Sequence, residues 1–221
     1  MKRFFLVLQR EFSYQWHSLT GLTAALFFTF LLIFISGYAF NYIQTKPDSR
    51  DIAIVFSLIF LISTQFSVSF LGMRSRSFLS ELKILPFTGA NVFLCRLFAI
   101  FAGIVVINIV SVPAFVVFFN LDVSYIAAFM LFVAVILVAI AQVSLGLITQ
   151  FSYVSGSKHL SSYALILTLP LLIPVFTAQL YAVKNILMHE NVNLREILII
   201  IGLDILYFAS GLVIFEFTSK N

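Results

Sequence analysis

Long apolar segments dominate this sequence and limit what it can fold into. Each is close to or above the roughly 20 residues that a helix needs to cross a bilayer. The segments run at about 19–43, 52–73, 92–119, 126–149, 159–183 and 196–217. The polar connections between them are too short to form a folded domain outside the membrane. The pattern predicts an all-α polytopic membrane protein with six transmembrane helices, in which residues 1–221 form a single transmembrane domain.

The composition excludes a water-soluble fold. Charged residues make up 10% of the chain and hydrophobic residues 62%, whereas a soluble domain has about 25% charged residues. The net charge of +4 comes from basic residues scattered among the connections, not from a basic patch with interleaved aromatic residues. We therefore expect the lipid bilayer, and no nucleic acid, as a partner.

Residues 1–18 predict an amphipathic helix that lies in the membrane interface. Apolar and basic side chains recur at helical spacing on different faces, Phe5, Leu8, Phe12 and Trp16 on one and Arg3, Arg10 and His17 on the other. A cleavable signal peptide places its positive region directly before its apolar core, whereas here the amphipathic segment intervenes. We expect this N-terminus to be retained.

The distribution of basic residues predicts the orientation. If the N-terminus is cytoplasmic, nine basic residues lie on the cytoplasmic side: Lys2, Arg3, Arg10, Arg74, Arg76, Lys83, Arg96, Lys158 and Lys220. Four lie on the other side: Lys46, Arg50, Lys184 and Arg195. This satisfies the positive-inside rule and predicts that both termini are cytoplasmic. The connection between the second and third spans is then the longest and most basic cytoplasmic one.

That connection, about residues 74–91, predicts a short amphipathic helix on the cytoplasmic surface. Apolar side chains recur at helical spacing, Glu81 and Lys83 project elsewhere, Pro86 ends the helix, and Thr88-Gly89 forms a turn before the next span. The residues expected to bind a soluble partner are Phe78, Leu79, Glu81, Leu82, Lys83, Leu85 and Pro86. The alternative is an ordinary interfacial loop.

Several predicted spans contain helix-distorting or polar residues, namely Pro113, Pro170, Pro174, Gln65, Asn108, Gln142 and Asp204. Pro170 and Pro174 fall one turn apart on one face, so the fifth span should bend or open locally. An ionisable group inside a span is a functional-site hypothesis by default. Pro170, Pro174 and Asp204 are therefore conformational or cargo-path candidates. The alternatives are that the prolines only shape packing and that Asp204 is neutral or hydrogen-bonded to another helix.

No motif for catalysis or metal binding emerges. The fragment Ser155-Gly156-Ser157-Lys158 lacks the spaced glycine and the ending of a phosphate-binding loop. Cys95 is the single cysteine and reads as a small core residue. His17, His159 and His189 are each isolated, and haem ligation by His189 is a minor alternative. We predict a non-enzymatic chain with no metal site and no directly bound cofactor.

Three stretches carry a family resemblance: Lys2-Arg3 to Gln15-Trp16, residues 78–87 (FLSELKILPF) and residues 165–174 (LILTLPLLIP), of which the last is the most specific. With the order of elbow helix, six spans and coupling helix, they resemble the membrane subunit of an ABC-2 exporter. More narrowly, the chain resembles the cytochrome c maturation protein B family over essentially its whole length. The family's coupling segment commonly reads Gly-x-Leu-Glu, whereas here Phe78 and Ser80-Glu81 stand in that region.

The resemblance implies a permease subunit in the bacterial inner membrane that works with a separate ABC ATPase. ATP would act through that subunit, and haem would be cargo. Other expected partners are the C and D membrane subunits of cytochrome c maturation and the haem chaperone E. The coupled event is either haem export or release of haem-loaded chaperone. The alternatives are an ABC-2 permease for a lipid, drug or glycan, and a membrane scaffold or proton-coupled carrier without an ATPase.

Overall fold

The computed structural model describes residues 8–13, 19–42, 48–73, 88–155, 158–188 and 194–219. These residues form a bundle of long helices: α2 (Leu19–Tyr42), α3 (Ser49–Met73), α5 (Gly89–Phe118), α6 (Tyr125–Ser155), α7 (Lys158–Leu187) and α8 (Leu194–Ser219). All six are long and apolar enough to cross a membrane. The predicted all-α fold with six spanning segments is confirmed for the described part of the chain, which contains no strand.

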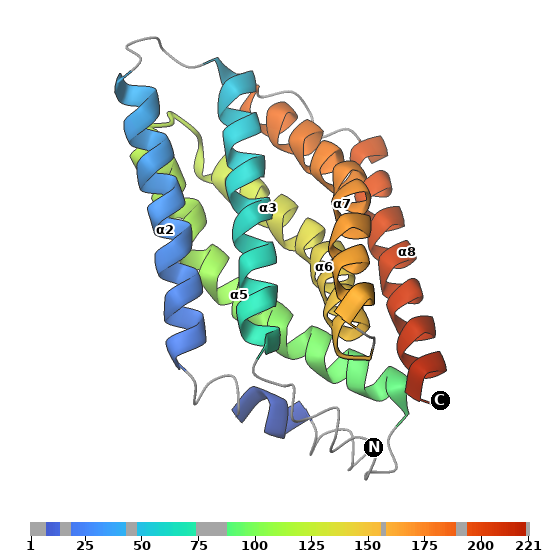
Figure 1. The fold of residues 1–221 in the computed structure, drawn as a ribbon. Helices are drawn as coiled ribbons and strands as arrows, with labels where there is room; N and C mark the ends of the chain where they lie inside the picture. Colours follow the sequence, from blue (N-terminus) through green and yellow to red (C-terminus); the bar gives the residue numbers. More distant parts are fainter. Residues whose placement is uncertain are drawn as a thin grey trace.

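The six helices run alternately up and down the bundle (Figure 1). The helical residues 8–13 and the last turn of α8 lie at one end, which we call the terminal end. Since α3 ends and α5 begins there, the connection between them leaves from and returns to the terminal end. We call the opposite end the distal end.

Four of the helices extend at least three residues past their predicted limits, including α3, which begins at Ser49 where 52 was expected. α6 continues to Ser155 where 149 was expected, α7 continues to Leu187 where 183 was expected, and α5 begins three residues early, at Gly89. Hydropathy reports only the part of a helix that lies in hydrocarbon, whereas backbone hydrogen bonding continues into the polar interface. The predicted ends were therefore wrong by up to six residues.

The two ends of α5 have recognisable local causes. Thr88 is extended, with φ −74° and ψ 144°, as expected of a residue that precedes a helix. At the other end Asn120 adopts φ 47°. The Asn120 amide donates to the Val117 carbonyl at 3.1 Å, and the Leu121 amide donates to the Val116 carbonyl at 3.0 Å. This is a Schellman C-cap with asparagine in the left-handed position, and it satisfies carbonyls that the helix end leaves open.

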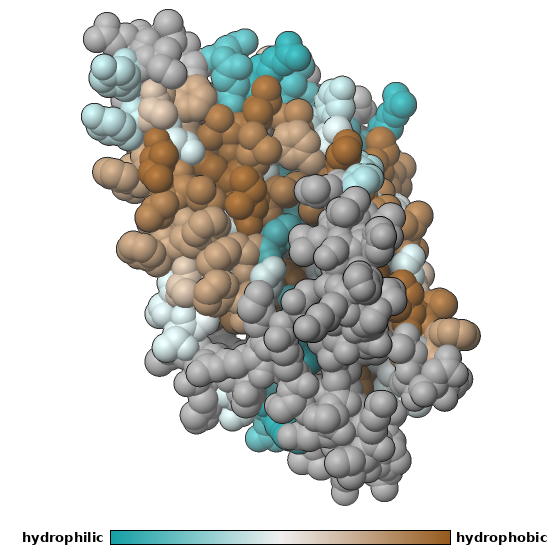
Figure 2. Space-filling view, viewed as in Figure 1, coloured by the Kyte–Doolittle hydropathy of each residue, from teal (hydrophilic) through white to brown (hydrophobic). Residues whose placement is uncertain are grey.

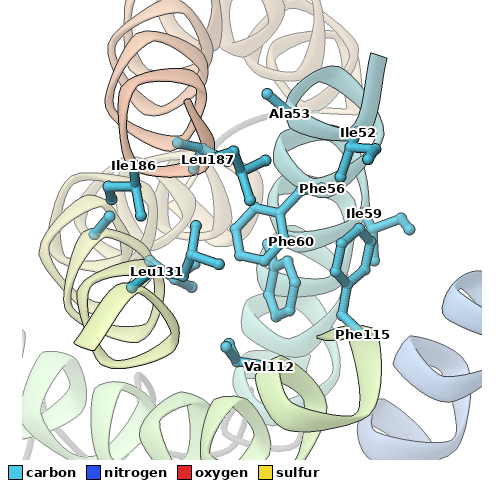
Figure 3. Close-up of a cluster of buried hydrophobic side chains, with 14 of the residues drawn as sticks. Ile52, Ala53, Phe56, Ile59, Phe60, Val112, Phe115, Leu131, Ile186 and Leu187 are labelled. Carbon is cyan, nitrogen blue, oxygen red and sulfur yellow. The ribbon is translucent and has the colours of Figure 1, made fainter. Parts of the chain in front are cut away.

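The interior is closed by apolar clusters at both ends. Toward the distal end, the Phe115 ring of α5 meets the Phe56 ring of α3 edge to face, with centroids 4.9 Å apart (Figure 3). Toward the terminal end, the Phe93 ring of α5 lies 5.1 Å from the Phe215 ring of α8. A further apolar cluster, including Val175 and Ala178, joins α6, α7 and α8.

The outer surface suits lipid. Phe27, Phe34 and Tyr38 of α2 are among many large apolar side chains that are exposed. Figure 2 shows hydrophobic side chains over the middle of one face and hydrophilic ones at the distal end. A broad exposed apolar surface of this kind is expected where the solvent is hydrocarbon.

Candidate functional site

The predicted coupling residues cannot be placed. Phe78, Leu79, Glu81, Leu82, Lys83, Leu85 and Pro86 all lie outside the described residues, as do His17 and His189. Of residues 1–18, which are predicted to form an amphipathic helix, the structure describes only residues 8–13, and these are helical.

Buried polar side chains meet in the middle of the bundle. The hydroxyls of Thr29 in α2 and Ser63 in α3 share a hydrogen bond, and both side chains are buried. Two residues further along α3, the Gln65 side-chain amide donates to the Gln142 carbonyl of α6 at 3.4 Å. These contacts link three helices at one depth, where polar groups are costly unless they are hydrogen-bonded.

The face of α6 that meets α3 carries Gln142, Gly146 and Gln150 at four-residue spacing. A Cβ on Gly146 would stand 2.6 Å from Cγ1 of Val68, so the glycine permits a close approach of the two helices. One turn on, the Gln150 side-chain amide donates to the Val68 carbonyl at 2.6 Å. The sequence reasoning noted Gln65 and Gln142 as polar residues within predicted spans but missed this contact, although the four-residue spacing along α6 was visible.

Asp204 connects α8 to α6. Its Oδ1 atom accepts a hydrogen bond from the Ala141 backbone amide at 2.9 Å. Ala141 lies in the middle of α6, where the amide ordinarily donates to the carbonyl four residues earlier, so the carboxyl group competes for a helical donor. The neighbouring crevice between α6, α7 and α8 is too narrow for water, and its lining is otherwise apolar: Val138, Ala141, Val175, Ala178, Ile200, Leu203 and Asp204. Asp204 thus makes a hydrogen bond to another helix, which was one of the alternatives considered from the sequence.

Pro170 and Pro174 are exposed on α7, and a side chain of α8 reaches the backbone between them. The Tyr207 hydroxyl donates to the Leu171 carbonyl at 2.7 Å, while the Thr177 hydroxyl donates to the Pro174 carbonyl at 2.9 Å. Proline lacks the amide that would bind the carbonyl four residues earlier, so the Pro170 carbonyl has no helical donor from Pro174. Tyr207, which the sequence reasoning missed, donates to the adjacent carbonyl.

Four buried side chains at similar depth hold polar atoms without a partner in the described residues. They are Asn108 Nδ2 and Ser111 Oγ on α5, Gln142 Oε1 on α6 and Gln179 Oε1 on α7. The side chains are at most 2% exposed. Asn108 and Ser111 lie between the α5 residues of the two end clusters. α5 therefore brings hydrogen-bonding groups into the middle of the bundle that neighbouring helices do not satisfy in this conformation.

Charged side chains gather at the terminal end of α5. Glu11, from helical residues 8–13, and Arg96, of α5, are both buried. Burial raises the pKa of the Glu11 carboxyl, while the positive charges of Arg96 and Arg10 lower it. On the other side, the Ala90 amide in the first turn of α5 donates to Glu216 Oε2 of α8 at 3.4 Å. The start of α5 is thus electrostatically coupled to residues 8–13 and hydrogen-bonded to α8.

The chain matches no family model and no curated protein sequence. Its resemblance to cytochrome c maturation protein B therefore rests on the residues quoted above. Among the described residues, no group of three or more histidine, cysteine or acidic side chains is placed to hold a metal ion. Chemically, the arrangement offers neutral hydrogen-bonding groups at mid-depth, one carboxyl group on α8 and, beside it, a helix that contains two prolines.

Proposed function

We propose that this chain is the membrane subunit of an ABC transporter of the ABC-2 class, moved by a separate ATPase and acting in cytochrome c maturation. The observation that carries the proposal is the position of the connection between α3 and α5. It is the longest connection between the six helices, and it joins them at the end that also holds residues 8–13 and the end of α8. Such a connection can act on two spans at once.

The orientation follows from charge. The terminal end corresponds to the side assigned nine basic residues, against four for the distal end. The positive-inside rule supports a cytoplasmic location for this end, where ATP is available. In the proposed assembly both termini lie inside, and the membrane is the bacterial inner membrane. Residues 1–18 would form the interfacial elbow helix.

Force on the connection would pass first into α5. The start of this helix is coupled to residues 8–13 through Glu11 and Arg96 and to α8 through Glu216. A displacement of α5 would also move Asn108 and Ser111, whose unpartnered atoms need not break hydrogen bonds to shift. These contacts support α5 as the first moving element of the membrane subunit.

The test is charged replacement in the coupling segment. Leu82→Glu or Leu85→Glu should abolish co-purification of the ATPase and reduce holo-cytochrome c at least tenfold, because a charge prevents an apolar face from docking in a groove. The matched control is Leu194→Glu, an exposed leucine at the distal start of α8. Unchanged co-purification and unchanged holo-cytochrome c in both coupling variants would refute the proposal.

A second candidate is an ABC-2 permease for another cargo, such as a lipid, drug or glycan. The observation that favours it is the neutral chemistry of the mid-depth groups: the unpartnered atoms of Asn108, Ser111, Gln142 and Gln179 suit hydroxyl or amide groups. Deletion of the chain separates the candidates. Loss of holo-cytochrome c supports the first, and an unchanged yield with a retained ATPase partner supports the second.

The proton-coupled carrier remains the alternative without an ATPase. It would require Asp204 to exchange a proton, whereas asparagine keeps an oxygen that can accept from the Ala141 amide. Intact transport in Asp204→Asn would exclude this carrier, and lost transport in a properly folded variant would support it.

A further inference from the structure

α7 has two parts that differ in packing. After Pro174 it is embedded in the bundle through a buried series consisting of Val175, Ala178, Gln179, Ala182, Val183, Ile186 and Leu187. At the proline pair, Pro170, Leu171, Ile173 and Pro174 are all exposed. The distal part is therefore fixed by packing, whereas the proline stretch has little side-chain packing to hold its backbone.

α8 contacts both neighbours from one face. Asp204 accepts from the α6 backbone at 2.9 Å, and three residues later Tyr207 donates to the α7 backbone at 2.7 Å. Residues three apart lie on the same side of a helix. α8 is thus joined to α6 within an apolar cluster and, from there, reaches across to the turn of α7 between the two prolines.

The turn between the two prolines lacks one backbone donor. Pro174 has no amide for the Pro170 carbonyl, so the carbonyl one residue before Leu171 loses its helical donor. In hydrocarbon a backbone carbonyl without a partner costs several kcal/mol, so neighbouring side chains commonly replace the lost donor. Tyr207 is 4% exposed and its hydroxyl lies 2.7 Å from the adjacent carbonyl, Leu171 O, so it ties to α8 the turn that lacks one of its own hydrogen bonds.

We propose that Tyr207 is a latch on a proline hinge. While its hydroxyl holds Leu171 O, α7 stays closed against α8. When the bond breaks, the part of α7 from residue 158 to Pro170 swings about the proline pair, and the part beyond Pro174 stays fixed. This proposal goes beyond the proposed function, because it depends neither on the cargo nor on an ATPase.

A double-mutant cycle tests the link between latch and prolines. Tyr207→Phe removes only the hydroxyl and should lower the thermal unfolding midpoint in detergent. In a Pro174→Ala background the helix regains its bond to the Pro170 carbonyl, which holds the turn without Tyr207, so the same substitution should cause less than half that drop. Ser210→Ala is the control, because the Ser210 hydroxyl donates to Leu206 O within α8. Equal drops in both backgrounds would overturn the proposal.

Spin-label distances test the motion itself. In a Cys95→Ala background, which removes the single cysteine, one pair joins residue 161 of α7 to position 217 of α8. A control pair joins positions 181 and 198, which are exposed on the distal parts of the same helices. Tyr207→Phe should broaden or shift the distances of the first pair only. A change in both pairs, or in neither, would overturn the proposal.

A second variant keeps the test valid if Tyr207→Phe does not fold. Replacing both Pro170 and Pro174 with alanine should restore the backbone amides that the prolines lack in α7. The distance distribution between positions 161 and 217 should then be narrower than in the parent protein. Because this variant keeps Tyr207, its result does not depend on the stability of the Phe substitution. An unchanged distribution would contradict a hinge at the prolines.

Discussion

α6 and α7 follow one another in the chain and are almost equally long, with 31 and 30 residues, yet they are built in opposite ways. α6 lies against α3, α5, α7 and α8 and presents Gly146 between two glutamines to α3. α7 carries two prolines at an exposed stretch, where a hydroxyl from α8 contacts its backbone. One helix is held by close approach, and the other is weakened where it could bend.

The difference indicates a division of work inside the membrane. Without a hydrophobic driving force between helices in lipid, association depends on tight packing and on interhelical hydrogen bonds. α6 has both, through Val68 of α3 and Asp204 of α8. Among the α7 side chains whose burial the structure describes, the buried ones all lie beyond Pro174. α6 is suited to be the frame, and the first half of α7 the moving part.

The largest effect should come from Gly146→Val in α6. A Cβ added at this position would lie only 2.6 Å from Val68 Cγ1, so the valine side chain forces α3 and α6 apart. We expect a loss of about 1–3 kcal/mol in unfolding free energy, measured by unfolding in detergent. Gly202→Val in α8 is the control, since a Cβ there meets nothing within 4 Å. Equal losses in both variants would show that helix separation is not the cause.

A smaller loss is expected for Gln150→Leu, which removes the hydrogen bond to the Val68 carbonyl but retains an apolar side chain. Interhelical hydrogen bonds in membranes contribute about 0.6 kcal/mol on average and up to about 1.7. Thr149→Val is the neighbouring control, because its hydroxyl bonds to Leu145 O and Gly146 O within α6. If the control loses as much as Gln150→Leu, the bond to Val68 does not stabilise the α3 contact.

The sequence predicted the spans well and the contacts between them poorly. Each span has an apolar run that hydropathy detects without knowledge of its neighbours, and the six predicted spans are all present as helices. Contacts depend on which faces meet. Asp204 was identified because a charge in a span is conspicuous. The Tyr207 contact was missed because a tyrosine in a span is usual at core and interfacial positions.

The burial of two further polar side chains was not predicted, for related reasons. Arg96, inside the predicted span 92–119, was counted only as a cytoplasmic charge, but it is buried in α5. Gln179 resembles a polar residue near a helix end, yet it is 1% exposed because its face of α7 turns inward. Spacing of four along α6 predicts that Gln142, Gly146 and Gln150 share a face, but not that this face meets α3. The coupling residues between 74 and 87 stay a prediction.

The smallest change in stability should come from Pro174→Ala, which makes α7 more like α6. The alanine restores a backbone donor to the Pro170 carbonyl, so the unfolding free energy should rise or stay within about 1 kcal/mol of the parent. Activity should nevertheless fall several-fold, measured as ATP hydrolysis by the complex or as holo-cytochrome c, because the hinge is stiffened. Pro113→Ala in α5 is the control, since this proline is also exposed inside a spanning helix. If Pro174→Ala is instead destabilised by more than about 1 kcal/mol with activity per folded molecule unchanged, the prolines shape packing, and the contrast between the two helices is structural rather than mechanical.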